Sequence, residues 1–239
     1  MNTFKKFLLF SILLMTIFAA GFVAAGEVTG TIKWDGDVPK MRPLKMDADP
    51  VCANHHSEPV LSEVLVLGDG NTMANIFVRI ISGLPDKKYD PPKEAAVLDQ
   101  KGCMYVPHVV GVMVDQDLKI LNSDGILHNV NVQSKENRSF NLGMPKGQTE
   151  AVKTFSREEH MIALKCNVHP WMAGYIGVMS HPFFAVTGTD GKFKIEGLPA
   201  GTYEVEAWHE RLGTMTSKVT LDSDGDSKTA DFTFSKPEK

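Results

Sequence analysis

Four residues of types that bind soft metals are spaced closely enough to share one site. Cys166, His169 and Met172 stand in one short stretch, Lys-Cys-Asn-Val-His-Pro-Trp-Met, and a second imidazole, His128, lies upstream. Two histidines, one cysteine and a weakly bound methionine are the ligand set of blue-copper electron-transfer centres. Soft sulfur ligands favour Cu(I), whereas imidazole suits Cu(II), so the mixture suits both oxidation states. The sequence therefore predicts a copper site at these residues.

The segments around these residues have the pattern of β-strands. The cysteine ends an apolar run over 161–166, and the methionine shortly precedes another run over 175–179. Pro170 restricts the turn between them and lowers the freedom of the loop before it binds anything. We expect a loop that closes two neighbouring strands and points its ligands at one centre. His128 must then come from a different strand.

Short apolar or alternating runs recur along the rest of the chain, separated by Asp-Gly turns, which predicts an all-β sandwich or barrel. The runs expected as strands are 28–34, 60–67, 74–81, 109–114, 118–121, 127–132, 161–166, 175–179, 183–186, 192–195, 203–208 and 216–221. The less regular stretches 37–59, 84–93 and 134–148 are expected to be surface loops. No long segment with helical periodicity lies beyond residue 25.

The N-terminus has the pattern of an export signal. Two lysines precede an apolar run that ends in small residues, which predicts a signal peptide over 1–25, cut before Gly26. An uncleaved anchor is the alternative, because the run approaches bilayer-spanning length. Cleavage predicts a periplasmic or secreted protein. The formal net charge is −4 with no basic run, so nucleic acid is not an expected partner.

The chain has three cysteines, and an odd number in an exported protein needs an explanation. The simplest is a disulfide between Cys52 and Cys103, with Cys166 kept as a thiolate by a metal. A competing interpretation joins Cys52-x2-His55 and Cys103-x4-His108 in a second metal site, since zinc and copper accept these ligand types. A third interpretation is that these cysteines are free, buried thiols.

The ligand segments resemble those of a known family. Asn122-x5-His128-Asn129 resembles the first-histidine segment of cupredoxins, the plastocyanin and amicyanin family, and Cys166-x2-His169-x2-Met172 resembles the short amicyanin-type ligand loop. The resemblance covers 74–179 and implies a Greek-key β-sandwich. It also implies that Asn129 ties the two ligand segments together by hydrogen bonds. The ligands it implies are His128, Cys166, His169 and Met172. His108, which follows Pro107, is a departure from the simple family pattern. It is expected to be either an additional metal ligand or a residue that caps a strand.

The C-terminal part resembles the carboxypeptidase regulatory-like, transthyretin-like β-sandwich module. The matching residues are Val186-Thr187-x2-Asp190-Gly191-x-Phe193-x-Ile195 and Leu198-Pro199-x-Gly201-Thr202-Tyr203. This likeness implies packing or partner contact rather than catalysis. The strand over 26–32 looks like the first strand of the same module, which leaves open whether the copper unit is inserted within it. The expected parts are a signal peptide (1–25), an N-terminal strand and loop (26–59), a cupredoxin-like copper domain (60–181) and a smaller Ig/transthyretin-like β module (182–239).

Together these features predict an exported blue-copper protein that carries single electrons and is not an enzyme. Cys166 would be the main covalent path, and His169, expected as the more exposed ligand, the exit to partners. Pro170, Trp171 and Ala173 would form an apolar docking rim. The expected partner is a redox protein such as a c-type cytochrome or a periplasmic oxidoreductase, and a membrane only if the N-terminus stays uncleaved. Two alternatives remain open, namely a periplasmic copper carrier and a metal-free structural or glycan-binding β-sandwich.

Overall fold

The computed structural model describes residues 25–236. The predicted signal peptide therefore lies outside the described residues, except for Ala25. The described chain is all-β, as the sequence predicts, with three short helical turns between the strands. Within this range no helix has the length and apolar character needed to cross a membrane.

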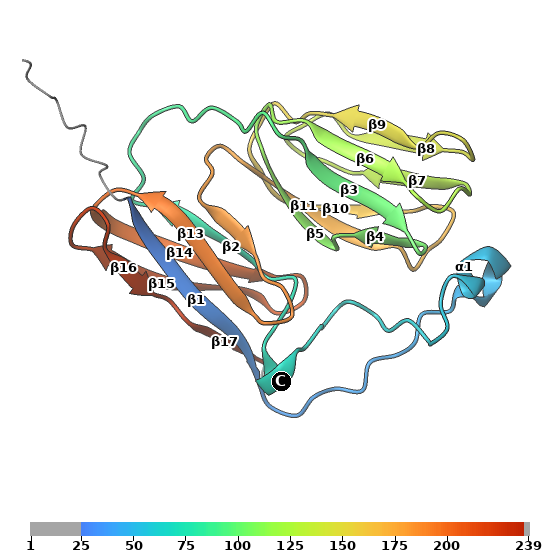
Figure 1. Ribbon diagram of the computed structural model, residues 1–239, viewed down its shortest axis with the longest axis horizontal. Coiled ribbons are helices and arrows are strands. Elements are labelled where there is room, and N and C mark those ends of the chain that lie inside the picture. Colours follow the sequence, from blue (N-terminus) through green and yellow to red (C-terminus); the bar gives the residue numbers. More distant parts are fainter. Residues whose placement is uncertain (1–24, 237–239) are drawn as a thin grey trace, which may run out of the picture.

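Nine strands form one β-sandwich, called the upper sandwich from its place in Figure 1. One sheet has the strand order β5-β11-β10-β7-β8 and the other β4-β3-β6-β9. The inward side chains of both sheets, such as Ile120 and Ile176, share one buried core. The strands are β3 (Ala96–Lys101), β4 (Met104–Val106), β5 (Val109–Met113), β6 (Leu118–Asn122), β7 (His128–Val132), β8 (Phe140–Met144), β9 (Glu150–Lys153), β10 (Glu159–Lys165) and β11 (Ala173–Met179).

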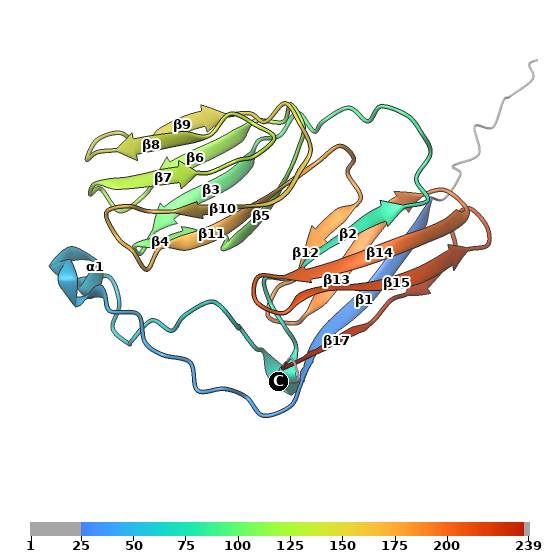
Figure 2. The ribbon, with the colours of Figure 1, turned by 180° about the vertical axis from the view of Figure 1, so that it is seen from behind.

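The remaining strands form a lower sandwich, which Figure 2 shows from behind. One sheet has the order β12-β2-β14-β15, and in the other β1 pairs with β13, β16 and β17. The chain on both sides of the upper sandwich thus builds the lower one. Its strands are β1 (Gly26–Asp35), β2 (Phe77–Ser82), β12 (Phe184–Val186), β13 (Lys192–Leu198), β14 (Gly201–His209), β15 (Gly213–Leu221), β16 (Ser227–Thr229) and β17 (Phe232–Ser235).

The two sandwiches meet where aromatic rings of the lower one lie on glycines of the upper one. The rings of Phe77 and Phe184 stack with their centroids 5.6 Å apart. Gly111 and Gly177 pair with each other across β5 and β11. A Cβ atom at Gly111 would lie 2.3 Å from the Phe184 ring, and one at Gly177 would lie 2.7 Å from the Phe77 ring. Any larger residue at these positions would push the sandwiches apart.

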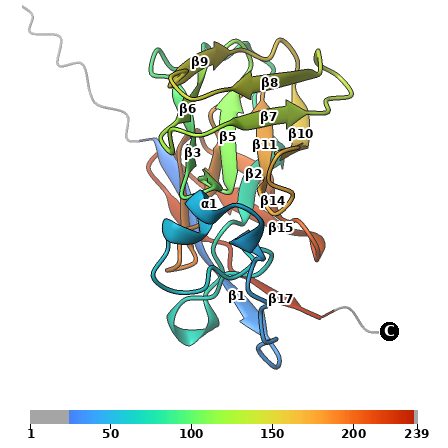
Figure 3. The same ribbon diagram turned by 90° about the vertical axis from the view of Figure 1, so that its right-hand side faces the viewer.

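Residues 36–76, called the N-terminal strap, leave β1, reach the far end of the upper sandwich and return to β2 (Figure 3). The strap contains two 3-10 turns, Met46–Ala48 and Asp69–Asn71, and one short helix, α1 (Pro50–Asn54). A disulfide joins Cys52 of α1 to Cys103, in the turn between β3 and β4. The pairing that the sequence favours is therefore present, and it fastens α1 to the upper sandwich.

Three secondary-structure predictions are wrong. Residues 60–67 form no strand, because they belong to the strap and make only single bridges at Leu61 and Leu67. The expected loop 37–59 contains α1. The expected loop 134–148 contains β8, which pairs with β7 at the edge of its sheet. An edge strand with one wet face carries polar residues and glycine, so its sequence looks like a loop.

Candidate metal centre

Three of the four predicted ligands converge in a buried cluster. His128 is fully buried, and His169 and Cys166 are each 2% exposed. His128 Nδ1 lies 2.9 Å from His169 Nδ1, and Cys166 Sγ lies 3.9 Å from the same His169 atom. One ring nitrogen from each histidine and the sulfur atom therefore face a common point. All three donor atoms lie within 4.8 Å of one another.

Two paired strands and one tight loop place these side chains. His128 begins β7, which pairs with β10, and Cys166 follows the last residue of β10. The loop then turns back on itself, because the Cys166 N–H donates to the Met172 carbonyl at 3.1 Å and the Met172 N–H donates to the His169 carbonyl at 2.9 Å. The His169 N–H points at Cys166 Sγ from 3.4 Å. The ligand loop is thus held by its own backbone.

The surroundings of Cys166 favour a thiolate. Burial alone would raise its pKa, but the hydrogen bond with His128 and nearby backbone N–H groups lower the pKa to about 7. The thiolate is the form of cysteine that binds metals. Within residues 25–236 this is the one cysteine outside the disulfide. The structure therefore keeps a single low-pKa thiol beside two imidazoles.

Asn129 and Met172 complete the neighbourhood of the cluster. The Asn129 side-chain carbonyl accepts from the Asn167 N–H at 2.7 Å and lies 3.4 Å from Cys166 Sγ. Asn129 thus joins the strand of one histidine to the loop of the other. Met172 is fully buried in the same core cluster as Cys166. Its role as an axial ligand stays a prediction.

Each histidine turns its other ring nitrogen toward an aspartate, which the sequence analysis missed. His128 Nε2 lies 2.9 Å from Asp124 Oδ2, and His169 Nε2 lies 3.1 Å from Asp49 Oδ2. Asp124 has a local signal, because it lies four residues before His128 in an Asp-Gly turn, but such a turn does not by itself predict that its carboxylate bonds to the histidine. Asp49 belongs to the strap and had no signal near either ligand segment.

This arrangement suits a metal ion. A carboxylate on Nε2 fixes the ring proton on that nitrogen and leaves the Nδ1 lone pair free. Two lone pairs at 2.9 Å repel each other, so a proton or a metal cation must lie between them. Without metal a proton meets this need. Burial alone would lower the pKa of His128, but its hydrogen bonds to Asp124 and Cys166 raise the pKa to about 9. The thiolate and the two inward nitrogens fit copper in chemical type.

His169 is only 2% exposed, so it offers almost no surface as an exit to partners. Its side chain is buried because the strap lays the start of α1 against its outer edge. Of the predicted docking rim, Pro170 and Ala173 are exposed, whereas Trp171 is half-buried. The Trp171 indole N–H donates to the Cys103 carbonyl at 3.1 Å, so it packs against the upper sandwich. The ligand loop is therefore shielded on the side that faces α1.

The alternative ligands of a second metal site lie apart. Cys52 and Cys103 are joined in the disulfide. His108 Nε2 lies 3.0 Å from Glu210 Oε1, and its Nδ1 lies 3.5 Å from Glu63 Oε2 on the other side of the ring. His55 lies 3.9 Å from Asp124. No candidate ligand group among residues 25–236 contains His108 or His55.

We expect His108 to make the stability of the protein depend on pH. Burial alone would lower its pKa, but the hydrogen bond to Glu210 and the negative charge of the nearby Glu63 outweigh it and raise the pKa from 6.5 to about 9. A group whose pKa is higher in the folded than in the unfolded protein stabilises the fold. This contribution is complete when the pH is below the pKa in the unfolded chain, and it is lost as the pH rises through about 9. The loss should be on the order of 3 kcal/mol in the free energy of unfolding.

Urea unfolding of metal-free protein across this pH range provides the measurement. As the pH rises from below 6.5 to above about 9, the variant His108→Gln should lose less stability than the wild type, because its side chain does not titrate. Equal slopes in the two proteins would show that His108 is not charged in the fold.

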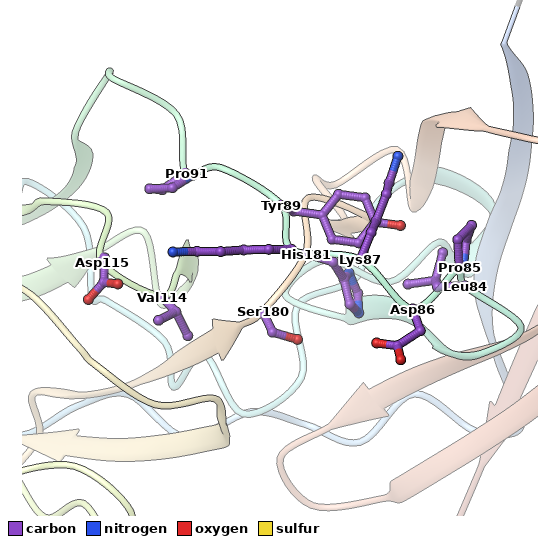
Figure 4. A pocket seen from close by; sticks show the side chains of 11 residues that line it. Leu84, Pro85, Asp86, Lys87, Tyr89, Pro91, Val114, Asp115, Ser180 and His181 are labelled. Carbon is purple, nitrogen blue, oxygen red and sulfur yellow. The ribbon is translucent and has the colours of Figure 1, made fainter.

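A separate surface pocket lies beside the loop between β2 and β3 (Figure 4). Its volume is about 360 Å³. The ring of Tyr89 meets that of His181 there at 6.4 Å between centroids. Lysines and aspartates both line the pocket, so charges of both signs are present and they favour neither anionic nor cationic ligands. It shares no residue with the His/Cys cluster.

Comparisons with known proteins identify similar structures but no family. No protein-family model and no curated protein matches the chain. A copper-containing nitrite reductase from Thermus scotoductus SA-01 is 19% identical over 40% of this chain and 24% of its own, with a TM-score of 0.33. A reduced mutant of amicyanin is 21% identical over 42% of this chain and 97% of its own, with a TM-score of 0.33. A purple cupredoxin from Nitrosopumilus maritimus is 19% identical over 35% of this chain and 98% of its own, with a TM-score of 0.30. The match thus spans about a quarter of the nitrite reductase.

Proposed function

We propose that this protein is a blue-copper electron carrier with copper bound by His128, Cys166 and His169. One observation carries the proposal. A low-pKa thiol and the Nδ1 atoms of two histidines meet in a buried cluster, and the Nε2 atom of each histidine is already hydrogen-bonded to an aspartate. The set contains a thiolate and imidazoles in the proportion that blue-copper sites use. Met172 would be a fourth, weakly bound ligand.

The chain supplies rigidity and exclusion of water. Copper, when bound, would supply the redox chemistry by gaining or losing one electron, which changes it between Cu(II) and Cu(I). The ligand loop is cross-braced by its own backbone and by Asn129, so its donors keep their positions. Donors that hardly move favour rapid exchange, because little reorganisation accompanies the charge change. Cys166 would be the main path for the electron, since its thiolate shares its charge with the metal.

Burial separates this proposal from that of a copper carrier. A protein that hands over its ion needs ligands that a partner can reach, whereas all three donors are buried. We propose an exported location and a redox-protein partner, such as a c-type cytochrome or a periplasmic oxidoreductase. We also propose that the lower sandwich is a regulatory-like module that packs and contacts partners. The visible spectrum of the copper-loaded protein through reduction and reoxidation tests the electron-carrier proposal.

We expect Met172→Leu to keep copper and colour but to raise the reduction potential. A blue-copper thioether is a long, weak ligand, and its removal destabilises Cu(II) relative to Cu(I). Leucine has a similar volume and should preserve the packing of this buried position. Voltammetry provides the measurement, with Met113→Leu as a matched buried methionine in β5 whose change should leave the potential alone. An unchanged potential in the Met172 variant would make Met172 a core residue.

A further inference from the structure

Both imidazoles of the candidate centre are held from outside by a carboxylate, and the two carboxylates come from distant parts of the chain. Asp124 precedes β7, whereas Asp49 lies in the strap, 120 residues away from His169 in the sequence. The proposed function uses only the inward nitrogens of the two rings. The outward contacts therefore call for a separate explanation.

We propose that Asp49 and Asp124 are positioning residues that orient the imidazole ligands and shift the centre toward Cu(II). This inference rests on the proposed function. A carboxylate that accepts the outer N–H fixes the ring tautomer and makes the inner nitrogen a stronger donor. Its negative charge would also act on a bound metal through the imidazole ring. Charge of this kind stabilises the more positive ion, so the reduction potential falls.

The two aspartates differ in how firmly they are held. The Asp124 side chain is 2% exposed, and it accepts backbone N–H bonds from Gly102 at 2.6 Å and Cys103 at 2.7 Å. The Asp49 side chain is 32% exposed, and it accepts the Val51 N–H at 2.9 Å as the cap of α1. Asp124 is thus a fixed part of the upper sandwich, and Asp49 is supplied by the strap.

Cys103 connects both carboxylates to the ligand loop. Its N–H donates to Asp124, and its disulfide holds Cys52, three residues after Asp49. Its carbonyl accepts the indole N–H of Trp171, in the ligand loop. One turn between β3 and β4 therefore sets the position of each outer partner. This convergence supports a role in the centre rather than a chance contact of a surface loop.

Asp49 offers the cleaner test, because it is partly exposed and can be changed without breaking the core. Asparagine and serine both cap helices well, so Asp49→Asn and Asp49→Ser should leave α1 intact. Asparagine keeps the length but loses the charge, and serine is too short to reach His169. Asp47→Asn, an exposed change in the same segment, provides the matched control.

We expect both Asp49 variants to have a higher reduction potential than the wild type, with Asp49→Ser at least as high as Asp49→Asn. Cu(II) affinity should fall about tenfold, the lower end for loss of such a partner, with little change for Cu(I). A tenfold preferential loss of Cu(II) corresponds to a rise of about 59 mV. Asp47→Asn should keep the wild-type potential.

A merely structural role predicts a different pattern. Loosening of the strap would weaken both oxidation states alike and leave the potential where it was. That outcome in both Asp49 variants, with copper still bound, would overturn the inference and leave the proposed function standing. Failure of the proposed function appears earlier, as a wild-type protein that binds no copper or gains no thiolate-to-copper colour.

Discussion

Copper-loaded Cys166→Ser protein is expected to lack the visible charge-transfer band of the wild type altogether. The band requires a thiolate bound to Cu(II), and no other free thiol lies within residues 25–236. A serine hydroxyl is a hard, poorly ionised donor that cannot replace the sulfur. Loss of an outer partner such as Asp49 typically lowers metal affinity 10- to 100-fold. Cys166 would bind the metal directly, so the fall in Cu(II) affinity should be larger.

The fold of this variant should survive, which makes the result interpretable. Serine is nearly the size of cysteine and keeps a group that can bond to Asn129 and to the His169 N–H. Visible absorption and metal content after copper loading give the measurement. Val168→Ala, an exposed change inside the same loop, provides the control and should keep full colour. Full colour in Cys166→Ser would mean that the ligand assignment is wrong.

Removing the disulfide is expected to cost about 4 kcal/mol of the free energy of unfolding, measured on the double variant Cys52→Ala/Cys103→Ala. The bridge spans 51 residues in the sequence, and a closed loop of that length removes much entropy from the unfolded chain. The variant should also lose the tether that keeps α1 beside His169. Urea unfolding of the metal-free protein provides the first measurement.

Two controls separate the bridge from ordinary side-chain effects. A strong reductant should bring the wild type down toward the double variant and leave the double variant itself unchanged. Thiol counting on denatured, metal-free wild type should find one free thiol, at Cys166. Three free thiols would show that the bridge does not form in the protein.

The sequence predicts the local half of the candidate site better than the distant half. Cys166, His169 and Met172 share one loop, so their spacing alone brings them together. His128 needs a second strand, and its Asn-x5-His-Asn context points to one. Asp49 was missed because no pattern links a proline-rich segment to a loop more than 100 residues later.

The burial of His169 has the same physical origin. The exposure of a loop residue depends on what else in the chain covers it, and here the cover is the strap. Strand pairing shows a similar limit. The apolar run of β2 predicts a strand, but its neighbours are β12 and β14, both far along the chain. Periodicity describes one face of one segment and carries no information about which partner completes it.

In the lower sandwich the first described strand pairs with the last two, and this affects the order of folding. β1 runs parallel to β16 and β17, and Thr31 bonds to Asp231 across 200 residues of sequence. Such a contact is slow to form from an open chain. The strands of the upper sandwich all lie between residues 96 and 179, and its formation draws β2 and β12 together as neighbours. An early-folding upper sandwich would then shorten the effective loop between β1 and β13, so that pairing these two strands costs less loop-closure entropy.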